Sequence, residues 1–309
     1  MTKRKVIIDT DPGIDDAAAM AIMLFSEQVE VPLITTVTGN VSLDKTTYNA
    51  LRLLPLFGKE VPVAKGADHP LLREPVDASD VHGETGMDGY DFPEPNEDLL
   101  LNETAVEAMY RVIMESDEPI TLMPIGPMTN VALLLREHPD VKENIQEIVS
   151  MGGSTSRGNI GIYSEFNYHV DPEAAKIVYE SGLPITMAGL NIGDKALLYI
   201  EDLEKLQKAN PVGDMLYHIF LRYRSGDGKV GLRIYDAYAA GYILNPEMYT
   251  TQKTFVGIET KGEFTSGASA ADLGNSLGRT HNANVLVDVD GEGFKEWFVN
   301  SIKNLILNH

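Results

Sequence analysis

The strongest constraint on the fold is an alternation of strand-like and helix-like segments over the first two thirds of the 309-residue chain. Continuous apolar runs, which indicate strands, lie at 5–8, 33–38, 120–123, 148–151 and 184–187. Helical patterns lie between them at 16–25, 103–116, 129–138 and 172–181. Apolar strands separated by helices are typical of a parallel sheet that is covered on both faces. We therefore predict an α/β fold with an open, mainly parallel sheet that is doubly wound and Rossmann-like.

The chain beyond residue 195 has a more helical pattern, with helices expected at 201–209, 212–223 and 235–244. We expect this helical C-terminal region to close a site at the edge of the sheet. Gly226-Asp227-Gly228 indicates a flexible connection between two of the helices. No internal repeat or domain linker is evident, so one domain over 1–309 is predicted.

A long segment at 74–98 is rich in Pro, Gly and Asp and has no periodicity. Long loops of this kind in compact domains are usually functional. We therefore expect this segment to contribute to a site.

Composition excludes several classes of function. The chain has no cysteine, which rules out zinc fingers, thiol nucleophiles and disulfide frameworks. Its net charge is −21, from 46 acidic and 25 basic residues, and such a field repels nucleic acid and anionic lipid. No secretory signal or membrane-spanning segment is apparent. We expect a cytoplasmic protein that binds neither nucleic acid nor membranes and is able to concentrate divalent cations.

Four carboxylates lie within the segment Asp9-Thr10-Asp11-Pro12-Gly13-Ile14-Asp15-Asp16. Asp9 and Asp11 are expected directly after the first strand, where ligands bind in open α/β sheets. So many like charges on one tight turn favour a bound cation, and oxygen ligands without His or Cys select Ca²⁺ or Mg²⁺. Helix capping would explain one or two of these acids, but not four. Strand-Asp-Thr-Asp also resembles the nucleophile loop of haloacid-dehalogenase-like phosphotransferases, although Gly13 departs from that pattern.

The segment from Asp9 to Ala17 resembles the signature of the inosine–uridine-preferring nucleoside hydrolase family. Further segments are similar to the family in the same order: Gly39-Asn40, Val81-His82-Gly83-Glu84-Thr85-Gly86, Pro124-Ile125-Gly126-Pro127-Met128-Thr129-Asn130, Met151-Gly152-Gly153, Glu165-Phe166-Asn167, Asp171-Pro172-Glu173-Ala174-Ala175, Gly189-Leu190 and Tyr235-Asp236-Ala237. Together they span residues 5 to about 246. The resemblance implies hydrolysis of the N-glycosidic bond of small-molecule ribonucleosides by a homodimer or homotetramer.

The resemblance also implies roles for individual residues. Asp11 would bind calcium and act as the general base that activates the attacking water. Asp16 would be a bidentate calcium ligand, completed by Asp236 and the backbone carbonyl of Ile125. Substrate would be bound by Asp15, Asn40, His82, Met151, Asn159, Glu165, Phe166, Asn167 and Tyr223. Within this set, Asp15 would accept a hydrogen bond from the ribose 2′-hydroxyl. This arrangement suits the chemistry, because the sugar becomes cation-like when the N-glycosidic bond breaks.

Two positions depart from the family pattern. Tyr235 stands where relatives often have the His that protonates the leaving base, and a phenol with an ordinary pKa near 10 suits neutral pH less well. Tyr223 and Tyr238 lie nearby in sequence, so a tyrosine-assisted pathway is conceivable, as is a packing role for Tyr235. Asn191 replaces a common Asp, which we expect to organise structure. These changes leave one alternative, a calcium- and ribose-binding module with little or no hydrolytic activity.

Overall fold

The computed structural model describes residues 3–223 and 231–307. Its strands are β1 (Arg4–Thr10), β2 (Val29–Glu30), β3 (Ile34–Thr36), β4 (Val63–Lys65), β5 (Leu100–Thr104), β6 (Ile120–Pro124), β7 (Ile145–Met151), β8 (Ile185–Ala188), β9 (Tyr249–Thr254), β10 (Val256–Ile258), β11 (Ser269–Ala271) and β12 (Ala283–Val289). Over these ranges the main sheet has ten strands in the order β5-β4-β3-β1-β6-β7-β8-β12-β9, with β2 beside β1. Only the β12–β9 pair is antiparallel among these neighbours.

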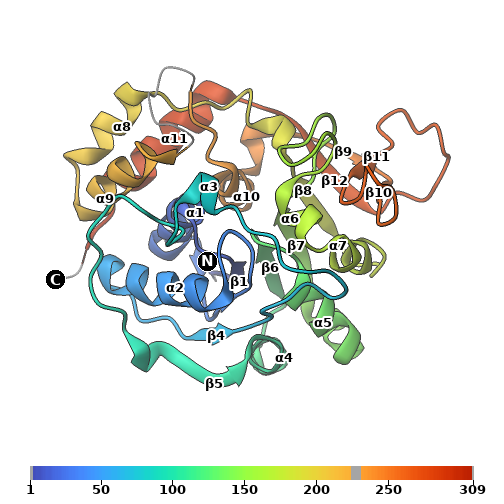
Figure 1. Cartoon of the computed structure of the whole chain (residues 1–309), viewed down its shortest axis with the longest axis horizontal. Coiled ribbons are helices and arrows are strands. Elements are labelled where there is room, and N and C mark those ends of the chain that lie inside the picture. The colour runs from blue at the N-terminus through green and yellow to red at the C-terminus, as the bar shows by residue number, and fades with distance from the viewer. Residues whose placement is uncertain (1–2, 224–230, 308–309) are drawn as a thin grey trace.

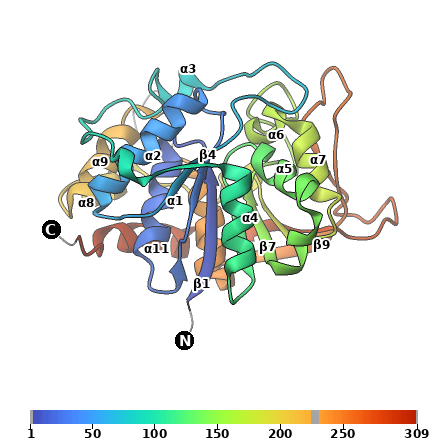
Figure 2. The same ribbon diagram turned by 90° about the horizontal axis from the view of Figure 1, so that it is seen from below.

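Helices cover both faces of this sheet (Figure 1 and Figure 2). They are α1 (Ile14–Phe25), α2 (Leu43–Phe57), α3 (Ser79–His82), α4 (Ala105–Glu115), α5 (Thr129–Glu137), α6 (Phe166–Val170), α7 (Pro172–Tyr179), α8 (Ile200–Gln207), α9 (Pro211–Phe220), α10 (Tyr235–Leu244) and α11 (Gly291–Lys303). In the part of the chain that the structure describes, no helix is long and apolar enough to cross a membrane.

Strand β1 shows why the sheet needs two helical layers. Val6 and Ile8 belong to a core formed with α1, α2 and α8 to α11, whereas Ile7 belongs to a second core formed with α4, α5 and α7. Side chains alternate across a strand, so a continuous apolar run supplies both faces. The predicted α/β fold with a mainly parallel, helix-flanked sheet is therefore confirmed.

Beyond residue 195 the structure contains strands as well as the expected helices. The predicted helices there are present as α8, α9 and α10, but β9 to β12 follow before the final helix α11. Strand β9 has exposed polar residues in its middle and lies at the sheet edge, so it lacks the apolar pattern of a buried strand. Strands β10 and β11 form a separate two-stranded sheet, which Figure 1 shows projecting from the body. The connection predicted at Gly226-Asp227-Gly228 lies outside the described residues.

The loops after β1, β3, β6 and β7 emerge at one edge of the sheet. The parallel register pairs Thr10 with Thr36 and Asp9 with Pro124, so the segments that follow these strands lie side by side. Helix α10 packs against α1 and brings the chain around residue 236 to the same edge. Residues far apart in the sequence therefore meet where ligands bind in such folds.

Asp9 is expected to follow the first strand, but it is the penultimate residue of β1 and is buried. One oxygen of its carboxyl group, Oδ1, accepts hydrogen bonds from Thr35 Oγ1 at 2.7 Å and Asn130 Nδ2 at 2.8 Å. Burial nevertheless raises the pKa of Asp9 to about 6. Asn130 also donates to the carbonyl of Thr36 and accepts from the amide of Ala67. It thus ties three segments of the sheet edge together.

Replacing Asn130 with Ala should lower the free energy of unfolding by about 3 kcal/mol, because a buried carboxyl and two backbone groups lose partners. Urea unfolding of the variant measures this loss. Asn300→Ala, on the exposed face of α11, is the matched control and should change stability by less than about 0.5 kcal/mol. Equal stabilities for the two variants would contradict this role for Asn130.

Candidate active site

Asp11 lies directly after β1 and is completely buried. Its Oδ2 accepts the backbone amide of Asn40 at 2.7 Å, while its Oδ1 has no hydrogen-bond partner among the described residues. The loops that follow β3 and β6 close around this carboxylate. A Cβ on Gly39 would lie 2.1 Å from Asp11 Oδ2, and one on Gly126 would lie 2.5 Å from Oδ1. Both positions therefore require glycine for the backbone to approach the carboxylate.

Asp16 is held from three directions at the start of α1. Its carboxylate accepts Thr10 Oγ1 at 2.6 Å, the Gly13 amide at 2.9 Å and Asn40 Nδ2 at 3.1 Å. The bond from Gly13 is a helix cap, so the capping interpretation is correct for Asp16. Capping does not account for Asp11, Asp15 or the remote acid described next.

Asp236 comes from the first turn of α10 and completes a buried cluster. Carboxylate oxygens of Asp15, Asp16 and Asp236 all lie within 4.8 Å of one another, and these residues form a group that could hold a metal ion. Burial raises the pKa of Asp236, and the charges of Asp15, Asp16 and Asp11 raise it further. Burial and the charge of Asp16 likewise raise the pKa of Asp11. A bound cation would relieve this repulsion.

The group of three carboxylates contains Asp15 where the predicted ligand set has Asp11. The sequence predicts Asp11, Asp16, Asp236 and the Ile125 carbonyl as metal ligands and places Asp15 on the sugar. In the structure it is Asp15 whose oxygens are grouped with those of Asp16 and Asp236. Asp11 lies near this group, since the charge of Asp16 raises its pKa. Its buried Oδ1 has no hydrogen-bond partner among the described residues. The donor set, oxygen throughout, suits a hard divalent cation.

The opposite wall is built by the segment that begins α6. Asn167 Nδ2 donates to the carbonyl of Ile125 at 2.9 Å and to that of Met151 at 3.3 Å. The Glu165 carboxylate accepts backbone amides of Gly153, Asn167 and Tyr168 at 2.9 to 3.2 Å. Glu165 therefore shapes this wall through the backbone. A carbonyl oxygen has two lone pairs, so Ile125 retains capacity for a further partner.

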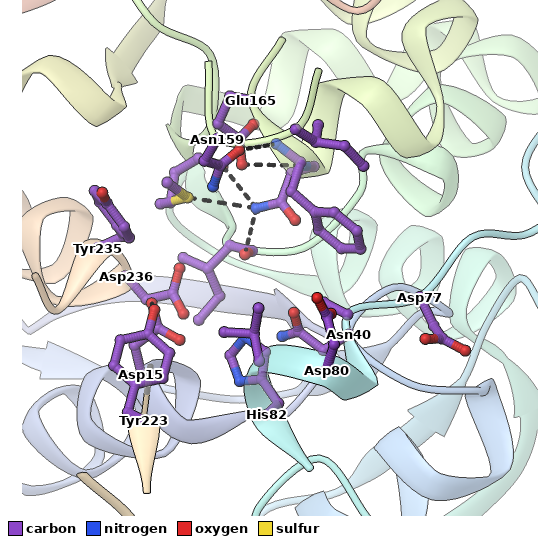
Figure 3. Close-up of a pocket in the computed structure, with 17 residues that line it drawn as sticks. Asp15, Asn40, Asp77, Asp80, His82, Asn159, Glu165, Tyr223, Tyr235 and Asp236 are labelled. Atoms are coloured by element: carbon purple, nitrogen blue, oxygen red, sulfur yellow. Dashed lines mark hydrogen bonds between the residues drawn. The ribbon is translucent and has the colours of Figure 1, made fainter. Parts of the chain in front are cut away.

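A polar cavity of about 240 Å³ lies between the two walls (Figure 3). All nine residues predicted to bind substrate line it, together with Ile125, Tyr235 and Asp236; Asp11 and Asp16 lie beneath its surface. Sequence reasoning missed Asp77, Ala78, Asp80, Val81 and Ile160 as lining residues. The first four belong to the 74–98 segment, whose composition alone marked it as functional. No Lys or Arg is among the described lining residues, so the cavity is strongly acidic.

The tyrosines named in the sequence occupy different places. Tyr223 and Tyr235 line the cavity, and the Tyr223 hydroxyl donates to Asp15 Oδ2 at 3.4 Å. Tyr238 is buried elsewhere and donates to the carbonyl of Ala196 at 2.9 Å, so it does not face the cavity. Burial raises its pKa well above the usual value. Of these three tyrosines, Tyr223 and Tyr235 are therefore the two in position to contact a ligand in the cavity.

Two other predicted residues have clear contacts. His82 accepts the backbone amide of Ile14 at its Nδ1, 3.1 Å away, and its ring lies 5.5 Å from that of Tyr223. This contact joins α3 to the start of α1. Asn191 donates to the carbonyl of Leu286 at 2.8 Å and does not line the cavity. Its contact with β12 agrees with the structural role expected for that position.

Comparison with known proteins agrees with this geometry. The sequence model described as "Inosine-uridine preferring nucleoside hydrolase" matches residues 6–296. A non-specific ribonucleoside hydrolase of Salmonella enteritidis is 48% identical over 292 residues, which are 94% of this chain and 95% of that protein.

Solved structures give the same result for the fold. An inosine-guanosine nucleoside hydrolase superposes with a TM-score of 0.91 at 29% identity, covering 99% of this chain and 100% of that one. A purine-preferring ribonucleoside hydrolase from Gardnerella vaginalis gives 0.88 at 29% identity, covering 98% and 99%. These relatives are hydrolases, which does not favour the alternative of a binding module. The chain belongs to the inosine-uridine preferring nucleoside hydrolase family and is a nucleoside hydrolase.

Proposed function

We propose that the chain hydrolyses the N-glycosidic bond of ribonucleosides, giving ribose and free base, at a calcium site formed by Asp11, Asp16, Asp236 and the Ile125 carbonyl. The observation that carries the proposal is the cluster of buried carboxylates beneath an acidic cavity, in which Asp11 Oδ1 has no partner among the described residues. When bound there, calcium supplies positive charge that lowers the pKa of water and anchors sugar hydroxyls.

The reaction needs a group that removes a proton from water. Asp11 is suited to this role, because its Oδ1 has no hydrogen-bond partner among the described residues and is left to accept a proton from water. The water oxygen bonds to C1′ as the bond between C1′ and the base nitrogen breaks, and the water proton passes to Asp11. The acidic wall, with Asp15 and Asp236 at the cavity surface, stabilises the positive charge that develops on the sugar.

The departing base gains a proton in the same reaction. Tyr235 lines the cavity next to Asp236, where its hydroxyl is the proposed proton donor to the base nitrogen. Asp15, Asn40, Asn159 and Asn167 are proposed to hold the sugar, and His82, Phe166 and Tyr223 to surround the base. The homodimer or homotetramer expected from the sequence stays a prediction.

Asp11→Ala should lower kcat by about 10³-fold or more, because the general base and a metal ligand are lost together. Release of reducing sugar from inosine and uridine, with calcium added or chelated, measures the loss. Asp98→Ala removes an exposed acid and should retain wild-type turnover. If the wild-type protein released no sugar from any common ribonucleoside while binding calcium, the proposed function would be wrong.

Tyr235→Phe should slow hydrolysis of inosine about 10- to 100-fold and that of p-nitrophenyl riboside much less, because the nitrophenolate leaves without a proton. Parallel kinetics with both substrates measure the difference. Tyr242→Phe, later on the same helix, is the matched control. Equal slowing of both substrates would remove Tyr235 from the acid role and favour the packing role.

The stability of the protein should depend on the charge of Glu165. Burial raises the pKa of Glu165 from 4.5 to about 7, so its ionised form is penalised in the folded state. This penalty is absent below about pH 4.5 and is complete above pH 7. Relative to Glu165→Gln, the metal-free wild-type protein should therefore lose about 3 kcal/mol of unfolding free energy over that interval. Urea unfolding at a series of pH values tests this, and a constant difference would contradict it.

A further inference from the structure

Asp15 lies close both to the carboxylates of Asp16 and Asp236 and to the hydroxyl of Tyr223. Its carboxylate lies within 4.8 Å of the oxygens of Asp16 and Asp236, close enough to share a cation with them. Its Oδ2 also accepts a hydrogen bond from the hydroxyl of Tyr223 at 3.4 Å. Figure 3 shows Asp15 and Asp236 side by side with Tyr223 next to Asp15. The same carboxylate is thus within reach of the metal ligands and of the substrate cavity.

Tyr223 is well placed to fix the direction of this carboxylate. Its side chain is 2% exposed and follows helix α9, which packs in the same core as α1. The tyrosine ring lies 5.5 Å from the ring of His82, and His82 in turn accepts the amide of Ile14. The Tyr223 ring is therefore packed against His82, which is itself hydrogen-bonded to the start of α1. A hydroxyl carried by a buried, packed ring restricts where the carboxylate oxygen that accepts its hydrogen bond can turn.

The direction of the Asp15 carboxylate affects how tightly the site would bind calcium. Calcium accepts six to eight oxygen ligands and binds more tightly as carboxylates are added to its shell. With Asp11, Asp16 and Asp236 already available, a fourth carboxylate that turned fully to the cation would strengthen metal binding. It would then no longer be free to accept a hydroxyl of the sugar.

We propose that Tyr223 is a positioning residue that assigns Asp15 to the sugar by holding its Oδ2 away from the metal ligands. This inference rests on the proposed function, since it takes the metal to be calcium and the ligand of Asp15 to be ribose. In this role the Tyr223 hydroxyl determines whether the Asp15 carboxylate binds the metal or the substrate.

The test is Tyr223→Phe, which keeps the ring against His82 and removes only the hydroxyl. Calcium affinity is measured by competition with a fluorescent chelator in the absence of nucleoside. It should tighten about 2- to 10-fold, the effect of one hydrogen bond. In steady-state kinetics with saturating calcium, KM for inosine should rise by a similar factor, with a smaller change in kcat.

A double-mutant cycle with Asp15→Asn shows whether the effect passes through Asp15. Tyr223→Phe should tighten calcium binding in the wild-type background and leave it unchanged in the Asp15→Asn background. Tyr217→Phe, on α9 and outside the cavity, is the matched control and should change neither quantity. Unchanged or weaker calcium binding in Tyr223→Phe, or equal tightening in both backgrounds, would overturn the inference. A wild-type protein that binds no calcium would instead count against the proposed function.

Discussion

The main physical constraint on this structure is the repulsion between carboxylates that are buried close together. Asp11, Asp15, Asp16 and Asp236 are each at most 5% exposed, and burial together with neighbouring carboxylates raises the pKa of Asp11, Asp16 and Asp236. In a medium of low polarity this repulsion is severe. Neutral donors offset part of it, notably Asn40, Thr10 and the Gly13 amide. A hard cation at the same place would offset the remainder, and helix capping accounts for Asp16 alone among these acids.

The fold supplies this cluster from separate parts of the sheet edge. The parallel register brings the loops after β1, β3 and β6 together, and the glycines at 39 and 126 let their backbones approach Asp11 closely. Helix α10, which packs against α1, then adds the remote acid Asp236 at the same edge. Glu165 and Asn167 build the facing wall through hydrogen bonds to backbone groups, so the acidic cavity has one wall of carboxylates and one of amides and carbonyls.

Much of this arrangement was predictable from the sequence, for reasons that differ between residues. The central strands are continuously apolar because both faces are buried, so the α/β fold follows from the pattern. Asp11 and Asp16 are local to one turn, whereas the pairing of Asp236 with them came from family resemblance. Strand β9 escaped prediction because edge strands carry polar residues. The approach of Tyr223 to Asp15 and the placement of Asp77 and Asp80 depend on tertiary packing, which no local pattern records.

Whether calcium holds the buried carboxylates together is tested most directly by a calorimetric titration of the metal-stripped protein. We expect one calcium ion bound per chain, with proton release, because Asp11, Asp16 and Asp236 have raised pKa values in the absence of metal. Asp236→Asn should greatly weaken binding while raising the melting temperature of the metal-free protein, since it removes one of the repelling charges. Wild-type protein that binds no calcium, or an Asp236→Asn protein that binds it equally well, would contradict the account.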